Sequence, residues 1–149
     1  MADLILKPAS AGDTFKLQNG GGTSVLEVSD NLASYSKGIS ENANTLTQSS
    51  ATITIDLATG TFFEFTLTEN VTGWTFSNVP VSGTACAWVI KITQHASSAK
   101  TVAYPSAVKW AGGTDHVMSI VTGAIDIISM FTIDGGTTIY ANEVGKAFA

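Results

Sequence analysis

Arginine is missing from the sequence: all seven basic residues are lysines, against twelve acidic residues, and the formal net charge is −5. Arginine provides the planar, bidentate group that binds phosphates and guanine bases. Binding to nucleic acid also depends on an excess of positive charge. Because the sequence has neither feature, we expect no nucleic acid among its partners.

Cysteine and long apolar runs are scarce too. Cys86 is the only cysteine, so no disulfide can form within the chain. Its neighbours Ala85, Ala87 and Trp88 are apolar, which predicts a small, buried and inert side chain. No apolar run approaches the roughly 18 residues that cross a bilayer. Residues 1–8 contain an early acidic residue and only three consecutive apolar residues, so we expect neither a membrane segment nor a secretory signal.

Charged residues of either sign make up 13% of the chain, which is about half the share usual in soluble domains. The mean hydropathy is +0.25. A surface with so few charges is typical of a protein that partners cover in part, or of a rigid module carried on a particle. The 149 residues suit one domain, or one domain with an arm.

What the sequence does contain is alternation of apolar and polar residues, which predicts an all-β fold. The alternating runs are Ile53–Leu57, Phe63–Leu67, Trp74–Phe76, Cys86–Ile92 and Ile125–Ile133. In the last run we expect Ile125, Ile127, Phe131 and Ile133 to form one face. The segment 134–136, Asp-Gly-Gly, is typical of a hairpin between the last two strands. Strands at this spacing predict an antiparallel β-sandwich or jelly-roll-like body.

The first fifty residues differ from the rest. Two short strand-like segments, 14–18 and 23–29, flank a glycine-rich turn, which predicts a short hairpin, and residues 38–50 are almost wholly polar, which is typical of a linker. We therefore divide the chain into an extended N-terminal attachment arm, residues 1–50, and a β-sandwich body, residues 51–149.

The arm has too few large apolar residues to offset the entropy of ordering it. We expect it to be ordered by neighbouring subunits or by a host surface. Its apolar residues are therefore candidate interface residues, together with Trp110 at a predicted strand end in the body. The arm candidates are Leu4, Ile5, Leu6, Phe15, Leu17, Val25, Leu26 and Leu32.

Motifs for catalysis or metal binding are not found. His95 and His116 fall in separate predicted loops, without a metal-ligand spacing, and are expected to be surface histidines. Glu64 and Asp126 are alternatives for a carboxylate pair of a glycosidase, although such residues are more often solvated or cross-strand partners of lysine. A triad that uses His116 is a remote alternative. We expect no enzyme activity, no metal and no cofactor.

Several segments follow one another in an order that resembles a family of proteins. These segments are Ile55–Gly60, Phe63–Val71, Phe76–Pro80, Ile90–Gln94, Lys100–Pro105, Val108–Gly113 and Asp134–Tyr140. Together they resemble a β-rich module of tailed-bacteriophage virion proteins, common at the C-termini of tail fibres and on particle surfaces. Leu6–Ser10 and Phe15–Thr23 are similar to leaders of phage fibre and head-decoration proteins.

The resemblance implies a virion component that is commonly trimeric and has no catalytic residues. Because 149 residues leave no room for a fibre shaft, we expect a capsid decoration, or cement, protein. It would form homotrimers on the capsid surface and bridge subunits of the major capsid protein. The alternative is a tail-fibre or other tail-associated module that binds a host-surface glycan or protein through loops around His95, Trp110 and Asp115.

Overall fold

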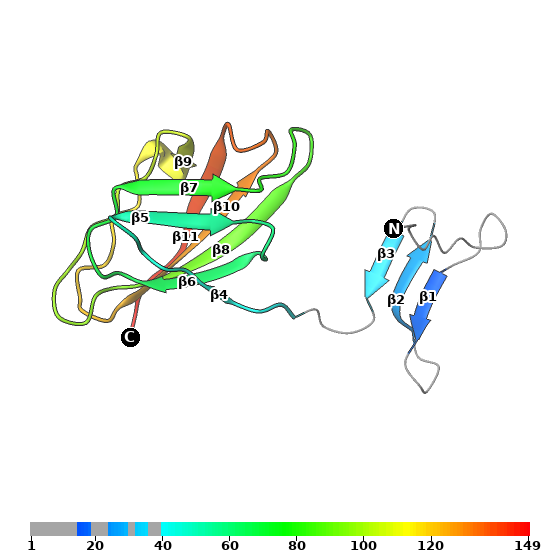
Figure 1. Ribbon diagram of the computed structural model, residues 1–149, viewed down its shortest axis with the longest axis horizontal. Coiled ribbons are helices and arrows are strands. Elements are labelled where there is room, and N and C mark those ends of the chain that lie inside the picture. The colour runs from blue at the N-terminus through cyan, green and yellow to red at the C-terminus, as the bar shows by residue number, and fades with distance from the viewer. Residues whose placement is uncertain (1–14, 19–23, 30–31, 36–39) are drawn as a thin grey trace. The chain divides into compact units, whose positions relative to one another are not determined.

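The computed structural model describes the backbone of residues 15–18, 24–29 and 32–35 and all of residues 40–149 (Figure 1). The chain divides into two compact units, Met1–Ser40 and Glu41–Ala149. The second unit therefore begins earlier than the predicted boundary between residues 50 and 51. Part of the predicted polar linker belongs to this unit, because Asn44 and Thr45 form a strand that pairs with Phe63 and Glu64.

The first unit contains a three-stranded antiparallel sheet of β1 (Phe15–Gln18), β2 (Ser24–Ser29) and β3 (Leu32–Tyr35), in that order. The pairing of β1 with β2 shifts register between Leu17 and Gln18.

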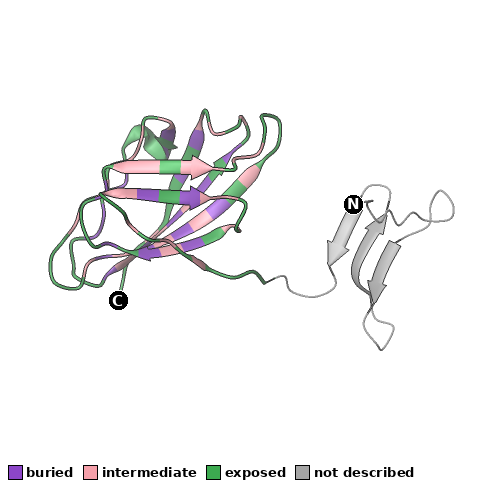
Figure 2. Ribbon diagram, in the orientation of Figure 1, coloured by how far each residue is buried: buried purple, intermediate pink, exposed green. Residues whose placement is uncertain are grey.

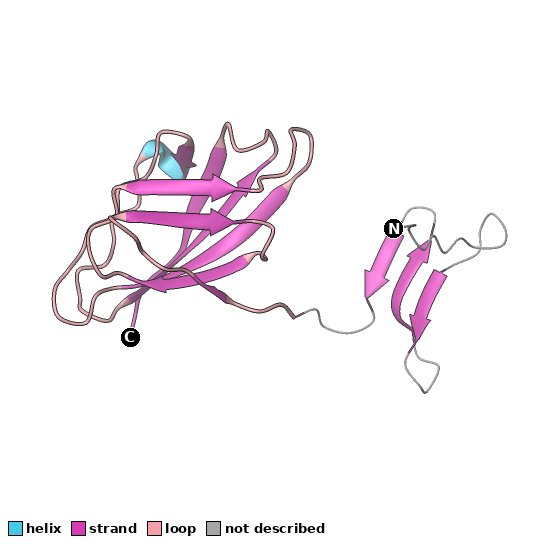
Figure 3. Cartoon of the chain, in the orientation of Figure 1, coloured by secondary structure: helices cyan, strands magenta, loops and turns pink. Residues whose placement is uncertain are grey.

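The second unit has two sheets, which confirms the all-β class (Figure 3). The smaller sheet pairs β5 (Thr52–Asp56) with β7 (Gly73–Ser77). The larger, six-stranded sheet is ordered β4 (Asn44–Thr45), β6 (Phe62–Thr66), β8 (Cys86–Thr93), β10 (Ile125–Thr132), β11 (Ile139–Phe148) and β9 (Val108–Trp110). A single 3-10 turn, Ala111–Gly113, follows β9 in the described part of the chain.

Strand direction differs from the antiparallel prediction. From β4 to β8 the chain passes back and forth between the two sheets, so that β4, β6 and β8 run parallel, as do β5 and β7. Strands β8, β10 and β11 are antiparallel, and β9 runs parallel to β11. The antiparallel prediction is wrong for the parallel pairs because alternation shows which side chains are buried and is blind to strand direction.

Two turns explain how the chain changes direction. A turn follows β5, in which the Ala58 amide donates to Asp56 Oδ1 at 3.0 Å, and the chain then enters the other sheet. The predicted hairpin between β10 and β11 is confirmed. Gly135 and Gly136 have φ angles of 73° and 81° there, a backbone conformation that favours glycine.

The core lies between the two sheets (Figure 2). Strand β5 contributes two fully buried isoleucines, and β6 and β8 contribute aromatic and aliphatic side chains from the larger sheet. Phe65 meets Trp74 edge to face at 6.1 Å, and Phe76 lies 5.7 Å from Trp88, so aromatic contacts join the layers. Cys86 packs against this core but is only partly buried, where we predicted a buried side chain, and burial raises the pKa of its thiol.

Strand β10 faces the opposite way from our prediction. Its buried residues are Asp126, Ile128, Met130 and Thr132, whereas Phe131 is exposed. Both faces of this strand carry apolar residues. Hydrophobicity alone therefore does not show which face is buried, and our prediction chose the exposed face. The polar residues on the inner face are tolerated because they have hydrogen-bond partners inside the protein.

Candidate functional site

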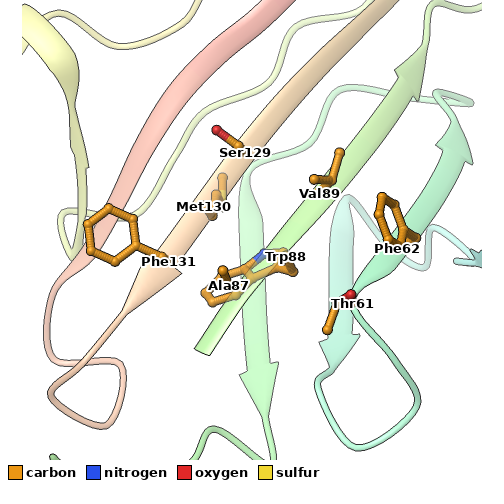
Figure 4. A pocket seen from close by; sticks show the side chains of 8 residues that line it. All are labelled: Thr61, Phe62, Ala87, Trp88, Val89, Ser129, Met130 and Phe131. Atoms are coloured by element: carbon orange, nitrogen blue, oxygen red, sulfur yellow. The ribbon is translucent and has the colours of Figure 1, made fainter. Parts of the chain in front are cut away.

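The face of the six-stranded sheet that points away from the core carries an apolar patch. We call it the outer face, and its residues are Phe62, Ala87, Val89, Ser129, Phe131 and Tyr140. They come from β6, β8, β10 and β11, which the register sets side by side: Phe62 lies opposite Val89 and Val89 opposite Ser129, while Phe131 lies between Ala87 and Tyr140. Figure 4 shows most of these side chains around a shallow hollow.

The hollow has a volume of about 400 Å³. Phe62 stands at one side of it and Phe131 at the other, with Ala87 and Val89 between them (Figure 4). The Phe131 ring stacks on that of Tyr140 with centroids 5.0 Å apart and an angle of 22° between planes. Phe62 is 49% exposed and Phe131 and Tyr140 are each 46% exposed. The sheet thus presents three half-uncovered aromatic side chains on a single apolar surface.

A balanced ion pair borders this patch. Glu64 and Lys91 face each other across β6 and β8, and Lys91 Nζ lies 2.9 Å from Glu64 Oε2. The hydrogen bond and the charge of Lys91 lower the pKa of Glu64. The prediction that Glu64 is a cross-strand partner of a lysine is confirmed. An apolar centre with a neutral polar border is typical of protein–protein interfaces and unusual for an exposed sheet face.

A second notable group is a buried charged cluster at the other end of β10. His116 Nε2 lies 3.1 Å from Asp126 Oδ2, and His116 Nδ1 lies 2.7 Å from Glu143 Oε2. The side chains of His116 and Asp126 are fully buried, whereas that of Glu143 is 42% exposed. The prediction that His116 is a surface histidine is therefore wrong, because two carboxylates compensate the cost of burying its ring.

Asp126 is the centre of this cluster. It also accepts hydrogen bonds from the Ser119 amide at 2.8 Å, the Ser119 hydroxyl at 2.6 Å and the Ala147 amide at 2.9 Å. Burial, the largest influence, acts to raise the pKa of Asp126. The bonds from Ala147 and Ser119, together with the charge of His116, outweigh it and leave the pKa below its ordinary value. Asp126 therefore remains a carboxylate in the folded protein.

The arrangement does not form a Ser-His-acid triad, since the Ser119 hydroxyl donates to Asp126 and not to His116. It does not form a glycosidase pair either. Asp126 is opposite Ile92 on the inner face, and Glu64 is opposite Lys91 on the outer one, so the sheet separates the two carboxylates. In this structure the cluster connects a loop and the C-terminal strand to β10.

The interface residues predicted from the sequence are not those that make up the outer face. Trp110 is only 9% exposed, and its ring packs against Tyr104 and stacks on His116, so the structure places it in the core and not at the surface. Among the arm candidates, Leu4, Ile5 and Leu6 lie outside the described residues. The backbones of Phe15 and Leu17 lie in β1, those of Val25 and Leu26 in β2, and that of Leu32 in β3.

Sequence reasoning missed the outer face. The sequence did contain a signal for it: the run Ile125–Thr132, which includes Phe131, has apolar residues on both faces of the strand. A strand that is apolar on both faces is normally covered on both. Here the second unit itself covers the inner face, and nothing in the second unit covers the outer face.

Comparison with known proteins adds no relative: no protein-family model, no curated protein and no solved structure matches this chain. A helix long and apolar enough to cross a membrane does not occur in the described part of the chain.

Proposed function

We propose that this chain is a structural protein of a bacteriophage virion, a capsid decoration protein that forms homotrimers and bridges subunits of the major capsid protein. The observation that carries the proposal is the outer face. Phe62, Phe131 and Tyr140 remain half exposed on a sheet whose other face is fully packed. Burying such a surface against other subunits removes apolar area from water, which favours association by about 25 cal/mol per Å².

Each part of the chain has a role in this proposal. The second unit, which we propose is a sandwich-like body with β5 and β7 as its second layer, associates with other copies through the outer face. The first unit attaches to capsid subunits. Three attachment points on one trimer then act together through their effective concentration, so that weak single contacts give firm binding. The proposal includes no catalytic step, and its localisation is the capsid surface.

The low share of charged residues, the succession of segments similar to phage virion modules and the all-β fold support this proposal. The experiment that tests it is the copy number in purified particles. A decoration protein is expected in hundreds of copies per particle, and its removal should make heads rupture at lower temperature. Light scattering of the purified protein should give the mass of a trimer. A stable monomer at micromolar concentration contradicts the proposal.

A tail-associated module that binds a host-surface glycan is the second candidate. A hollow of about 250 Å³ favours it, since Lys109, Asp115 and Ser106 are among the residues that line this hollow and carry charged and hydroxyl groups. Such a module would be present in a few dozen copies per particle or fewer, and the purified protein would bind host cells. The same measurement of copy number separates the two functions.

A further inference from the structure

The loop of residues 114–120, here the latch loop, buries the side chain of Met118 in the core and makes several polar contacts with the larger sheet. His116 contacts Asp126 on β10 and Glu143 on β11, and Ser119 donates twice to Asp126. The Lys146 ammonium on β11 donates to the Val117 carbonyl. The apolar side chains of Val117 and Ile120, by contrast, are 67% and 78% exposed.

The contacts of His116 require a particular number of protons. Carboxylate oxygens only accept hydrogen bonds, and a neutral imidazole has a single N–H. With a carboxylate oxygen at each ring nitrogen, the three side chains must together hold one proton more than a neutral imidazole and two ionised carboxylates. Asp126 is already held as a carboxylate by three other donors, and Glu143 reaches solvent. The ring is therefore the group that can carry this proton, as an imidazolium between two carboxylates.

We propose that His116 is a proton-operated latch: the doubly protonated ring ties the latch loop to both β10 and β11, and loss of one proton releases the C-terminal part of β11. Asp126 keeps its contact, since the ring retains one N–H. Glu143 loses its partner, because Nδ1 without its proton is an acceptor and can no longer donate to the Glu143 carboxylate. This inference does not depend on assembly or on the proposed function.

Several charged and titratable groups surround His116. Glu143 and Lys146 come from β11, and Asp126 from β10. Asp115 and Lys100 line a hollow shared with His116 beside the latch loop. The ring of Tyr104 packs against that of His116, with the ring centroids 6.3 Å apart. Burial raises the pKa of Tyr104, and the charges of Asp126, Asp115 and Glu143 raise it further, so this hydroxyl stays neutral while His116 changes charge.

The released segment is one that the sheet holds weakly. Strand β9 covers only Ile139–Ala141 of β11, so residues 142–148 lack a neighbouring strand on that side. On the other side their register with β10 is irregular around Ile127. The latch loop thus protects a strand edge that would otherwise be open to pairing with another chain.

Nuclear magnetic resonance tests the latch on the full chain. The ring nitrogens of His116 report its protonation, and hydrogen exchange reports the protection of residues 142–148, after correction for the intrinsic pH dependence of exchange. We expect both ring nitrogens to carry protons when the segment is protected. As His116 loses a proton, protection of residues 142–148 should fall about 10- to 100-fold, the effect of one charge-assisted hydrogen bond. Protection of Ile139–Ala141 should be unchanged over the same range.

Two variants make the result specific. Glu143→Gln offers an N–H to the neutral ring, so its C-terminal segment should stay protected and show no step when His116 titrates. His95→Gln, at a half-buried histidine that contacts Ser97, is the matched control and should keep the wild-type step. The proposal is overturned if His116 carries a single proton while residues 142–148 remain fully protected, or if the step persists unchanged in Glu143→Gln.

Discussion

Replacing Phe131 by glutamate should weaken self-association strongly and leave the folded subunit intact. Phe131 is on the outer face, stacked on Tyr140 and 46% exposed. If other copies cover the outer face, this ring becomes buried in the assembly, and a carboxylate in its place would have to be desolvated there. Because the ring is about half exposed in the isolated subunit but stacks on Tyr140, loss of this aromatic pair should lower the free energy of unfolding by about 0.5–1.5 kcal/mol, which is small enough to leave the subunit folded.

The magnitude follows from the exposed area. A buried aromatic side chain removes roughly 150–250 Å² from water, so 46% of one leaves about 70–115 Å² to be covered on association. At about 25 cal/mol per Å² this corresponds to about 2–3 kcal/mol for each Phe131. The dissociation constant should therefore rise about 30- to 150-fold. Desolvation of the new carboxylate adds to this effect.

Sedimentation equilibrium of the purified protein measures the change, and urea unfolding checks that the variant is folded. Val121→Glu is the control, because Val121 is 62% exposed but lies in a loop, outside the outer face. We expect association of this control to match the wild type. The reasoning fails if the wild-type protein is monomeric, or if Phe131→Glu associates as tightly as Val121→Glu.

Three further outcomes are expected. Ile90→Ala, at a fully buried core position, should lower the free energy of unfolding by about 2–5 kcal/mol in urea titrations. Gln94→Leu should lower it by about 1–3 kcal/mol for each group left unpaired, since the amides of His95 and Lys100 donate to Gln94 Oε1. The pKa of Asp126 lies below its ordinary value of 3.8, so its contribution to stability is complete above that pH and is lost as the pH falls through the lower, folded value. The urea midpoint of Asp126→Asn should accordingly depend less on pH in the acid range, and an unchanged dependence would contradict this assignment.

The sequence predicts those strands well in which one face is apolar and the other polar. Ile53 and Ile55 alternate with threonines, and Phe63 and Phe65 flank Glu64, so their inward direction follows from the pattern alone. Strand direction could not be predicted in this way, because parallel and antiparallel strands share the same two-residue period. The parallel pairing of β5 with β7 arises because the turn after β5 leads into the other sheet. The residues of a turn do not show whether the next strand joins the same sheet or the other one.

The candidate sites were harder to predict than the strands. The outer face was missed because Phe131 sits on a strand that is apolar on both sides. The buried cluster was missed because His116, Asp126 and Glu143 are far apart in the sequence and are united only by the register of β10 with β11 and by the latch loop. Spacing rules recognise ligand sets on one helix or hairpin, and this group spans three separate segments.

Strand β10 links the outer face and the buried cluster, and its two unusual residues can be compared. It places an ionised Asp126 inside and an aromatic Phe131 outside, the reverse of what the stability of an isolated sheet favours. Asp126 has an explanation within the subunit, because it anchors the latch loop and the amide of Ala147. Phe131, with Phe62 and Tyr140, has none, since nothing in the second unit covers these rings. A partner surface that buries them removes the discrepancy, and the partner that the proposed trimer supplies is a second copy of the same chain.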